Sequence, residues 1–150
     1  MQTFEIKNRY TGAVIYSGGG ESLRDVVVAA VKRGANLGGA DLRGADLGGA
    51  DLIGAYLGRA YLRRAYLGGQ TLAGDRPILQ IGPIGSRSDY LVAYLTTDGV
   101  YVQAGCFFGA LDDFRKAVSE THGDSAHGRE YLAAIAMIES HAAIWMPLED

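Results

Sequence analysis

The sequence has little cysteine and no long apolar run, and these shortages exclude several kinds of protein. Cys106 is the single cysteine, so no disulfide can form within the chain, which fits a reducing compartment. No stretch approaches the roughly 18 consecutive apolar residues that a membrane-spanning helix needs. The first ten residues, MQTFEIKNRY, lack the basic flank and apolar core of a signal peptide. We therefore expect a cytoplasmic protein that does not associate with a membrane.

Signatures of nucleotide and metal chemistry are also scarce. The glycine-rich stretches GGG and GPIGS do not have the strand–GxxxxGK[ST]–helix arrangement of a phosphate-binding loop. A lone cysteine cannot complete a zinc set, and the spacing of His122, Asp124 and His127 is not a strong ligand pattern. We expect no cofactor, no metal and no enzymatic activity. The alternative is an enzyme in which Cys106 is the nucleophile and His122 the base.

Charge is distributed unevenly along the chain. Residues 1–34 carry a net charge of +2 and residues 35–74 carry +1, whereas residues 75–150 carry −6. This asymmetry has two interpretations. The acidic half meets a charged partner, or it is the solvated surface of an ordinary soluble domain.

A five-residue repeat occupies residues 35–74. Its eight units place Leu at every fifth position from Leu37 to Leu72, and Ala lies two positions before the Leu in the first seven units. A period of five fits neither a helix nor a strand, so we expect the chain to turn a corner once per unit. Leu and Ala would then point inward, with glycines at the corners. An internal repeat of this kind predicts a solenoid.

These units, which begin ANLGG, ADLRG and ADLGG, resemble the pentapeptide-repeat family, whose pattern is A-(D/N)-L-X-X. The resemblance implies a right-handed quadrilateral β-helix with four units per coil, in which the residue between Ala and Leu points outward. Eight units would make two coils, a solenoid about 10 Å tall that needs a cap at each end. The outward residues would then stack in four pairs: Asn36 beside Tyr56, Asp41 beside Tyr61, Asp46 beside Tyr66, and Asp51 beside Thr71.

The flanking segments predict a mixed α/β (α+β) fold. Residues 3–17 are typical of a β-hairpin, the glycines that follow are expected to end its second strand, and residues 21–33 predict a helix. The C-terminal part predicts strands over 76–86, 89–97 and 100–108 and helices over 111–121 and 128–144. The expected domains are an N-terminal ββα cap (1–34), the two-coil β-helix (35–74) and a module of three strands and two helices (75–150).

Candidate partner-binding residues lie on the second coil and in the acidic half. Tyr and Arg are enriched among binding hot spots, so an exposed set of them favours a protein partner. The alternative is that the tyrosines pack beneath the hairpin or the C-terminal module. The candidates are Tyr56, Tyr61, Tyr66, Arg59, Arg63 and Arg64 in the repeats, and Asp112, Asp113, Glu120, Asp124 and Glu130 in the acidic half.

The resemblance implies a non-enzymatic protein-binding module. Some pentapeptide-repeat proteins imitate DNA with a long acidic solenoid and so occupy DNA-handling enzymes. This solenoid is short and carries +1, so any mimicry must use the acidic half. Residues 75–150 resemble tail segments of phage and prophage pentapeptide-repeat proteins. That similarity names no function by itself. The family resemblance and the acidic half together imply an inhibitor of a host nucleic-acid-handling protein, such as a CRISPR effector or a topoisomerase, that acts in the host cytoplasm without binding nucleic acid. A self-associating structural protein, such as a homodimer, is the remaining alternative.

Overall fold

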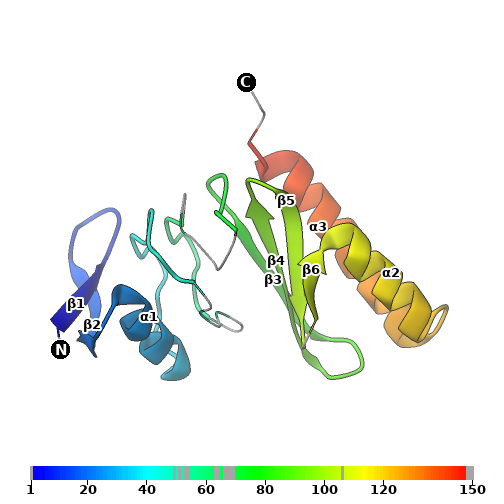
Figure 1. The fold of residues 1–150 in the computed structure, drawn as a ribbon, viewed down its shortest axis with the longest axis horizontal. Coiled ribbons are helices and arrows are strands. Elements are labelled where there is room, and N and C mark those ends of the chain that lie inside the picture. The colour runs from blue at the N-terminus through cyan, green and yellow to red at the C-terminus, as the bar shows by residue number, and fades with distance from the viewer. Residues whose placement is uncertain are drawn as a thin grey trace. The chain divides into compact units, whose positions relative to one another are not determined.

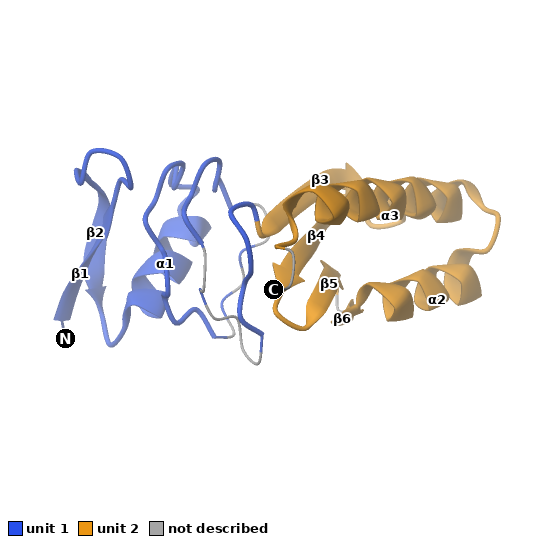
Figure 2. Ribbon diagram, turned by 90° about the horizontal axis from the view of Figure 1, so that it is seen from above, with its two compact units in different colours: residues 1–76 blue, residues 77–150 orange. Residues whose placement is uncertain are grey.

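The computed structural model describes residues 2–48, 50, 52, 55–62, 65, 70–105 and 107–147. These residues form a mixed α/β fold with strands in two sheets and with three helices (Figure 1). The chain divides into two compact units, residues 1–76 and residues 77–150, which Figure 2 colours separately. Among the described helices, none combines the length and the apolar character that crossing a membrane requires.

Unit 1 begins with an antiparallel hairpin of β1 (Gln2–Lys7) and β2 (Val14–Gly20), as the sequence predicts. The prediction that the glycines end the second strand is wrong, because β2 continues through them to Gly20. A Cβ atom at Gly20 would lie 2.9 Å from the Cβ of Asp25. The absent side chain therefore lets the end of the strand lie against the start of helix α1 (Leu23–Lys32).

Helix α1 has a side-chain cap at its N-terminus and a glycine after its C-terminus. The hydroxyl of Ser22 accepts a hydrogen bond from the amide of Asp25, whose carboxylate in turn accepts one from the amide of Glu21. The Ser22 hydroxyl thus satisfies one of the free amides at the helix start, and the Asp25 carboxylate holds the residue before the cap. Gly34 follows the helix with a φ of +69°, a conformation that suits glycine and ends a helix. The helix predicted over 21–33 is confirmed.

The repeats turn once per unit, as their period predicts. In six successive units the Ala amide donates to the carbonyl of the Leu three residues earlier, at N···O distances of 2.9 to 3.1 Å. Gly39 and Gly44 occupy the third position of two of these turns with φ of +73° and +69°. A type II turn needs a positive φ at this position, which glycine adopts without cost. The predicted inward residues that are buried are Leu37, Leu42, Leu47, Leu52, Leu62, Leu72, Ala40, Ala45, Ala55, Ala60 and Ala65.

Residues twenty positions apart in the repeats lie side by side. Asn36 forms a parallel bridge with Tyr56, and Asp41 forms one with Tyr61. Both pairs are those that four units per coil predict, so these two stacking predictions are confirmed. The other two predicted pairs include residues outside the described part of the chain, namely Tyr66 and Asp51.

Unit 2 contains a four-stranded antiparallel sheet rather than the three strands that the sequence predicts. Its order is β3 (Ile78–Ile84), β4 (Asp89–Thr96), β5 (Gly99–Ala104) and β6 (Phe107–Ala110). The prediction is wrong because the segment 100–108 is two strands. Gly105 has a φ of +60°, which ends β5 and lets the chain return as β6.

Two helices cover one face of this sheet (Figure 1). They are α2 (Leu111–His122) and α3 (Ala126–Trp145), and both were predicted from the sequence. Side chains on alternate positions of the strands pack against the buried faces of these helices. The buried core they form comprises Leu91, Ala93, Val102, Phe114, Val118, Ala134, Ile135 and Ile138.

Candidate functional site

Tyr61 is the centre of a group of arginine and tyrosine side chains in unit 1. It lies between Ala60 and Leu62, whose side chains are buried, and it is itself half-buried. Two guanidinium groups lie over its ring, with the Cζ atoms of Arg9 and Arg43 at 4.4 Å and 5.0 Å from the ring centroid. At exposed positions each such cation–π contact contributes about 0.5 to 1 kcal/mol.

Backbone hydrogen bonds hold the β1–β2 turn against the repeats. The amide of Arg9 donates to the carbonyl of Gly39 at 2.7 Å, and the amide of Asp41 donates to the carbonyl of Lys7 at 2.7 Å. The Arg9 side chain reaches further along the repeats, where its Nη1 donates to the carbonyl of Arg59 at 3.4 Å. Arg9 is therefore positioned by the backbone of both elements rather than by a free loop.

Asn8 shapes the turn that presents this arginine. Its Oδ1 atom accepts hydrogen bonds from the amides of Tyr10 and Thr11, at 2.8 and 3.0 Å. An Asn side chain that bonds to the backbone of the following residues is typical of a tight turn. The ring of Tyr10 is 65% exposed and lies 5.0 Å from the Cζ atom of Arg9. We refer to Arg9, Tyr10, Arg43, Arg59 and Tyr61 as the arginine–tyrosine cluster.

Arg59 has an unfavourable backbone conformation. It occupies the third position of the turn from Leu57 to Ala60 with a φ of +60°, where Gly39 and Gly44 stand in the corresponding turns. A residue with a Cβ atom pays roughly 1 kcal/mol or more for this conformation. Such strain in a folded protein is concentrated at functional positions, so the choice of arginine here points to a role for its side chain.

The acidic and amide residues of the first repeat units have a structural role. Each accepts a hydrogen bond from an amide two residues later in its own turn, which stabilises that turn. The acceptor–donor pairs are Asn36 with Gly38, Asp41 with Arg43, and Asp46 with Gly48. Asp41 is also 3.9 Å from the guanidinium of Arg43. Among the described residues, the carboxylate of Asp41 is the one that lies near an arginine of the cluster. Residues 1–76 together carry a net charge of +3.

The repeat residues predicted to bind a partner do not all lie in the cluster. Tyr61 and Arg59 lie in the cluster, whereas Tyr56 is 63% exposed and pairs with Asn36. The sequence also allowed the tyrosines to pack beneath the hairpin. This holds in part for Tyr61, because Arg9 of the hairpin turn lies over its ring. The other predicted repeat residues, Tyr66, Arg63 and Arg64, lie outside the described residues.

Three members of the cluster, Arg9, Tyr10 and Arg43, were not among the site residues predicted from the sequence. Arg9 and Tyr10 precede the repeats and reach them only because the hairpin turn docks on the backbone of Gly39 and Asp41. The turn motif NRYTG was the available signal, since it predicts where the chain reverses but not what the turn contacts.

The predicted acidic residues of unit 2 lie on α2, on α3 and, for Asp124, in the turn between them. Asp112 lies 2.6 Å from Arg115, which also lies 3.2 Å from Glu139. The Glu130 carboxylate accepts a hydrogen bond from the amide of Gly85, in the turn between β3 and β4. These contacts give some of the acids structural roles. The remaining predicted acids, all exposed, are Asp113, Glu120 and Asp124.

Histidine and cysteine residues form no recognisable metal centre in the part of the chain that the structure describes. No group of three or more His, Cys, Asp or Glu side chains there could hold a metal ion. The rings of His122 and His127 lie edge to face, with their centroids 6.1 Å apart. Cys106 is outside the described residues, so the pairing of Cys106 with His122 stays a prediction.

A family model described as pentapeptide repeats matches residues 33–69 in eight copies. No curated protein and no solved structure matches the chain. The matched segment contains Arg43, Arg59 and Tyr61, whereas Arg9 and Tyr10 precede it. The cluster is therefore formed where the repeats meet a hairpin that is not part of the match.

Proposed function

We propose that this chain is a protein-interaction module that binds an acidic segment of another protein through the arginine–tyrosine cluster. Pentapeptide repeats suggest an interaction or structural module, and proteins that contain them are generally non-enzymatic. The observation that carries the proposal is Arg59, an arginine in a turn position where glycine would be less strained. Its backbone carbonyl accepts a hydrogen bond from the Arg9 side chain, and two residues later comes Tyr61, whose ring lies under the guanidinium groups of Arg9 and Arg43.

The chemistry of the cluster favours carboxylates as the recognised groups. A guanidinium presents a planar fork of donors that matches the two oxygens of a carboxylate. Tyr10 offers an exposed ring beside these forks, and aromatic–arginine combinations are common among binding hot spots. The positive charge of residues 1–76 would also speed the encounter with an acidic partner.

Neutralising the arginines tests this proposal. The probe is a fluorescently labelled ten-residue poly-glutamate peptide, and binding is followed by its anisotropy. The variant Arg9→Gln/Arg43→Gln/Arg59→Gln is expected to bind about tenfold more weakly, because three exposed ion pairs each contribute about 0.5 kcal/mol. The control removes three positive charges elsewhere, at Lys32, Arg33 and Lys116, each replaced by Gln.

Two outcomes would overturn the proposal. If the cluster variant and the control lost the same affinity for the peptide, net charge alone would explain the binding. Tighter binding of a duplex DNA of the same charge than of the peptide would make nucleic acid the ligand, and with it a different function.

We also infer that the repeats complete a right-handed quadrilateral β-helix of two coils, capped by the hairpin and α1 at its start. One turn per unit and the two pairings at a separation of twenty residues support this architecture. A crystal structure of the full chain would test it. Absence of the pairing between Asp46 and Tyr66 would contradict four units per coil.

A narrower proposal concerns the identity of the partner. We propose that it is a host nucleic-acid-handling protein, a CRISPR effector or a topoisomerase, which a phage-encoded chain inhibits in the host cytoplasm. The supporting observation is the charge of residues 77–150, which is −6, together with exposed acids on and after α2. These acids would meet the basic surface on which such a protein binds DNA.

Competition with DNA tests the narrower proposal. Binding of duplex DNA by a purified effector or topoisomerase is measured with and without the chain, which is expected to weaken it. The variant Asp113→Asn/Glu120→Gln/Asp124→Asn should lose this effect. A control with the same charge change, Glu5→Gln/Glu21→Gln/Asp98→Asn, should retain it. Unchanged DNA binding across several candidate proteins would count against inhibition but not against the binding of acidic segments.

A further inference from the structure

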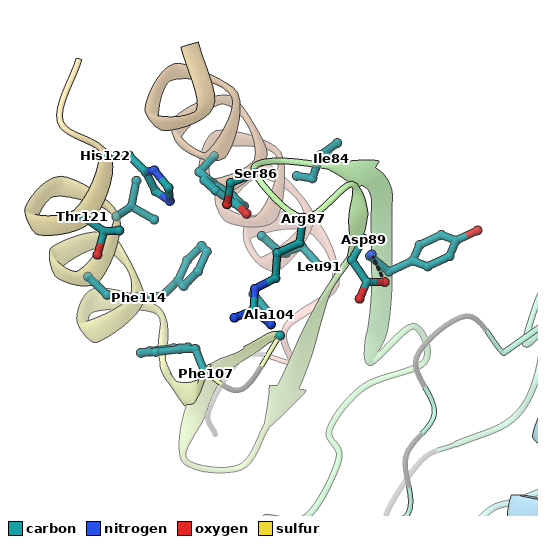
Figure 3. Close-up of a pocket in the computed structure, with 15 residues that line it drawn as sticks. Ile84, Ser86, Arg87, Asp89, Leu91, Ala104, Phe107, Phe114, Thr121 and His122 are labelled. Atoms are coloured by element: carbon teal, nitrogen blue, oxygen red, sulfur yellow. Dashed lines mark hydrogen bonds between the residues drawn. The ribbon is translucent and has the colours of Figure 1, made fainter. Parts of the chain in front are cut away.

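Unit 2 contains a cavity of about 270 Å³ that is separate from the arginine–tyrosine cluster. It opens between the β3–β4 turn, the adjoining ends of β5 and β6, and helix α2 (Figure 3). Its lining combines apolar side chains, which include Leu91, Phe107, Phe114 and Val118, with the polar or charged side chains of Ser86, Arg87, Asp89, Thr121 and His122. An apolar interior with a few polar groups is the usual composition of a small-molecule site.

Aromatic side chains give the interior its shape. The ring of Phe114 lies 5.3 Å from that of Phe107 and 5.9 Å from that of Tyr131, the latter in an edge-on arrangement. His122 extends this group, with its ring 5.4 Å from that of Tyr131. A flat ligand ring can pack against such a wall with favourable offset or edge-on geometry.

Arg87 supplies a positive charge to the lining of the cavity. Its side chain extends from the β3–β4 turn along the opening, toward Ala104 and Phe107 (Figure 3). A Cβ atom at Gly105 would lie 3.3 Å from its Nη1 and 3.5 Å from its Cζ, so the guanidinium rests against a bare backbone. Within the described part of the chain Arg87 makes no ion pair. Its donors are therefore available to an anion in the cavity.

The turn that carries Arg87 is held to helix α3. The amide of Gly85 donates to the carboxylate of Glu130, and the Gly85 backbone lies directly against the phenol of Tyr131. Both contacts fix the turn two residues before Arg87. The site is thus formed by packed elements in the absence of ligand, which lowers the entropy cost of binding.

We infer that this cavity binds a small aromatic carboxylate, with its ring against Phe107, Phe114 and Tyr131 and its carboxylate on Arg87. An apolar cavity of about 150 Å³ accommodates benzene, so the volume here suffices for one ring and a short acidic arm. The guanidinium accounts for the carboxylate, because a bidentate pair with arginine is the strongest common recognition of that group. The inference does not depend on the proposed function, because the cavity includes neither the arginine–tyrosine cluster nor Asp113, Glu120 or Asp124.

Phenylacetate and its neutral isostere phenylacetamide test the inference on the wild-type chain. Binding is followed by the ¹H–¹⁵N NMR spectrum of the full chain. Phenylacetate is expected to cause saturable shifts at the amides of Arg87, Gly105 and Thr121, and to bind at least tenfold more tightly than phenylacetamide. Equal affinities would remove Arg87 from recognition. Shifts that are scattered or do not saturate would exclude the site altogether.

Variants then assign the interaction. Arg87→Gln is expected to weaken the binding of phenylacetate about tenfold and to leave the binding of phenylacetamide unchanged. Arg87→Lys should recover part of the lost affinity. Arg129→Gln, an exposed arginine on α3, is the matched control and should change neither. Ala117→Leu places a larger side chain in the cavity wall and should abolish the binding of both ligands. If Arg87→Gln left phenylacetate binding intact, the inference would be wrong.

Discussion

Tyr61 lies beside Asp41, the residue twenty positions earlier, in a parallel bridge that is hydrogen-bonded on both sides. The amide of Tyr61 donates to the carbonyl of Ala40 at 2.7 Å, and its carbonyl accepts from the amide of Leu42 at 2.8 Å. The backbone of the repeats therefore fixes the position of Tyr61 before any side chain contributes. The repeats change from Asp to Tyr along the sequence, and the fold places these two kinds of residue side by side. Asp41 stabilises its own turn, and beside it the ring of Tyr61 contacts Arg9 and Arg43.

The strain at Arg59 predicts an unusual stabilising substitution. Arg59→Gly is expected to raise the free energy of unfolding by about 0.5 to 1 kcal/mol, because glycine adopts a positive φ without steric cost but loses more entropy on folding. Urea unfolding measures the change. Gly44→Ala is the matched control, since its Cβ would meet nothing within 4 Å and only the φ of +69° opposes it. It should destabilise by about as much.

The same substitution should weaken binding to the poly-glutamate peptide. A variant that is more stable yet binds less well is the expected trade-off at a functional position. If Arg59→Gly were less stable than the wild type, the arginine side chain would be contributing more than the turn costs. Its strain would then be no argument for function.

The ring contacts of Tyr61 predict an energetic coupling with Arg9. In a double-mutant cycle of Arg9→Gln and Tyr61→Leu, the coupling in the free energy of unfolding should be about 0.5 to 1 kcal/mol, the strength of an exposed cation–π contact. The cycle of Arg43→Gln with Tyr61→Leu should give a smaller value, because its Cζ lies at 5.0 Å rather than 4.4 Å. A coupling of zero for Arg9 would show that the hairpin turn is held by its backbone bonds alone.

Self-association is distinguishable from binding of a different protein by sedimentation. If the cluster serves a separate acidic partner, the wild type and Tyr61→Ser should both sediment as monomers at the same concentration. A wild-type dimer that Tyr61→Ser converts to monomer would instead favour the structural alternative. The negative charge of residues 77–150 makes the comparison at low and high salt informative, because a charge-driven contact between copies weakens with salt.

Much of unit 1 could be predicted from the period of its residues. Each Leu occupies the same position in a five-residue unit, so its burial and the turn after it follow from repetition alone, and Leu47 is fully buried as expected. The pairing of Asn36 with Tyr56 follows from the number of units per coil. The cluster could not be predicted in full, because Arg9 reaches Tyr61 through a tertiary contact of a hairpin turn that no local pattern encodes.

Glycine produced the two errors of strand assignment, in opposite directions. At Gly20 the missing side chain permits close packing of a continuing strand against α1, although a run of glycines ordinarily predicts a break. At Gly105 a positive φ divides an apolar run that reads as one strand into two. Glycine allows both outcomes, and only the packing around it decides between them.

Gly85 gives the sharpest test of how unit 2 is held together. A Cβ atom there would overlap the hydroxyl oxygen and the Cζ atom of Tyr131, and the φ of Gly85 is +76°. Gly85→Ala should therefore lower the free energy of unfolding by about 3 kcal/mol, well beyond the cost of φ alone.

The double variant Gly85→Ala/Tyr131→Ala separates the two causes. Removing the phenol removes the overlap, so Gly85→Ala should cost only about 1 kcal/mol in the Tyr131→Ala background, the part that arises from φ. Urea unfolding of the four chains completes the cycle. An equal cost of Gly85→Ala in both backgrounds would mean that the ring moves aside freely. The β3–β4 turn would then be anchored by its hydrogen bond to Glu130 and not by packing on Tyr131.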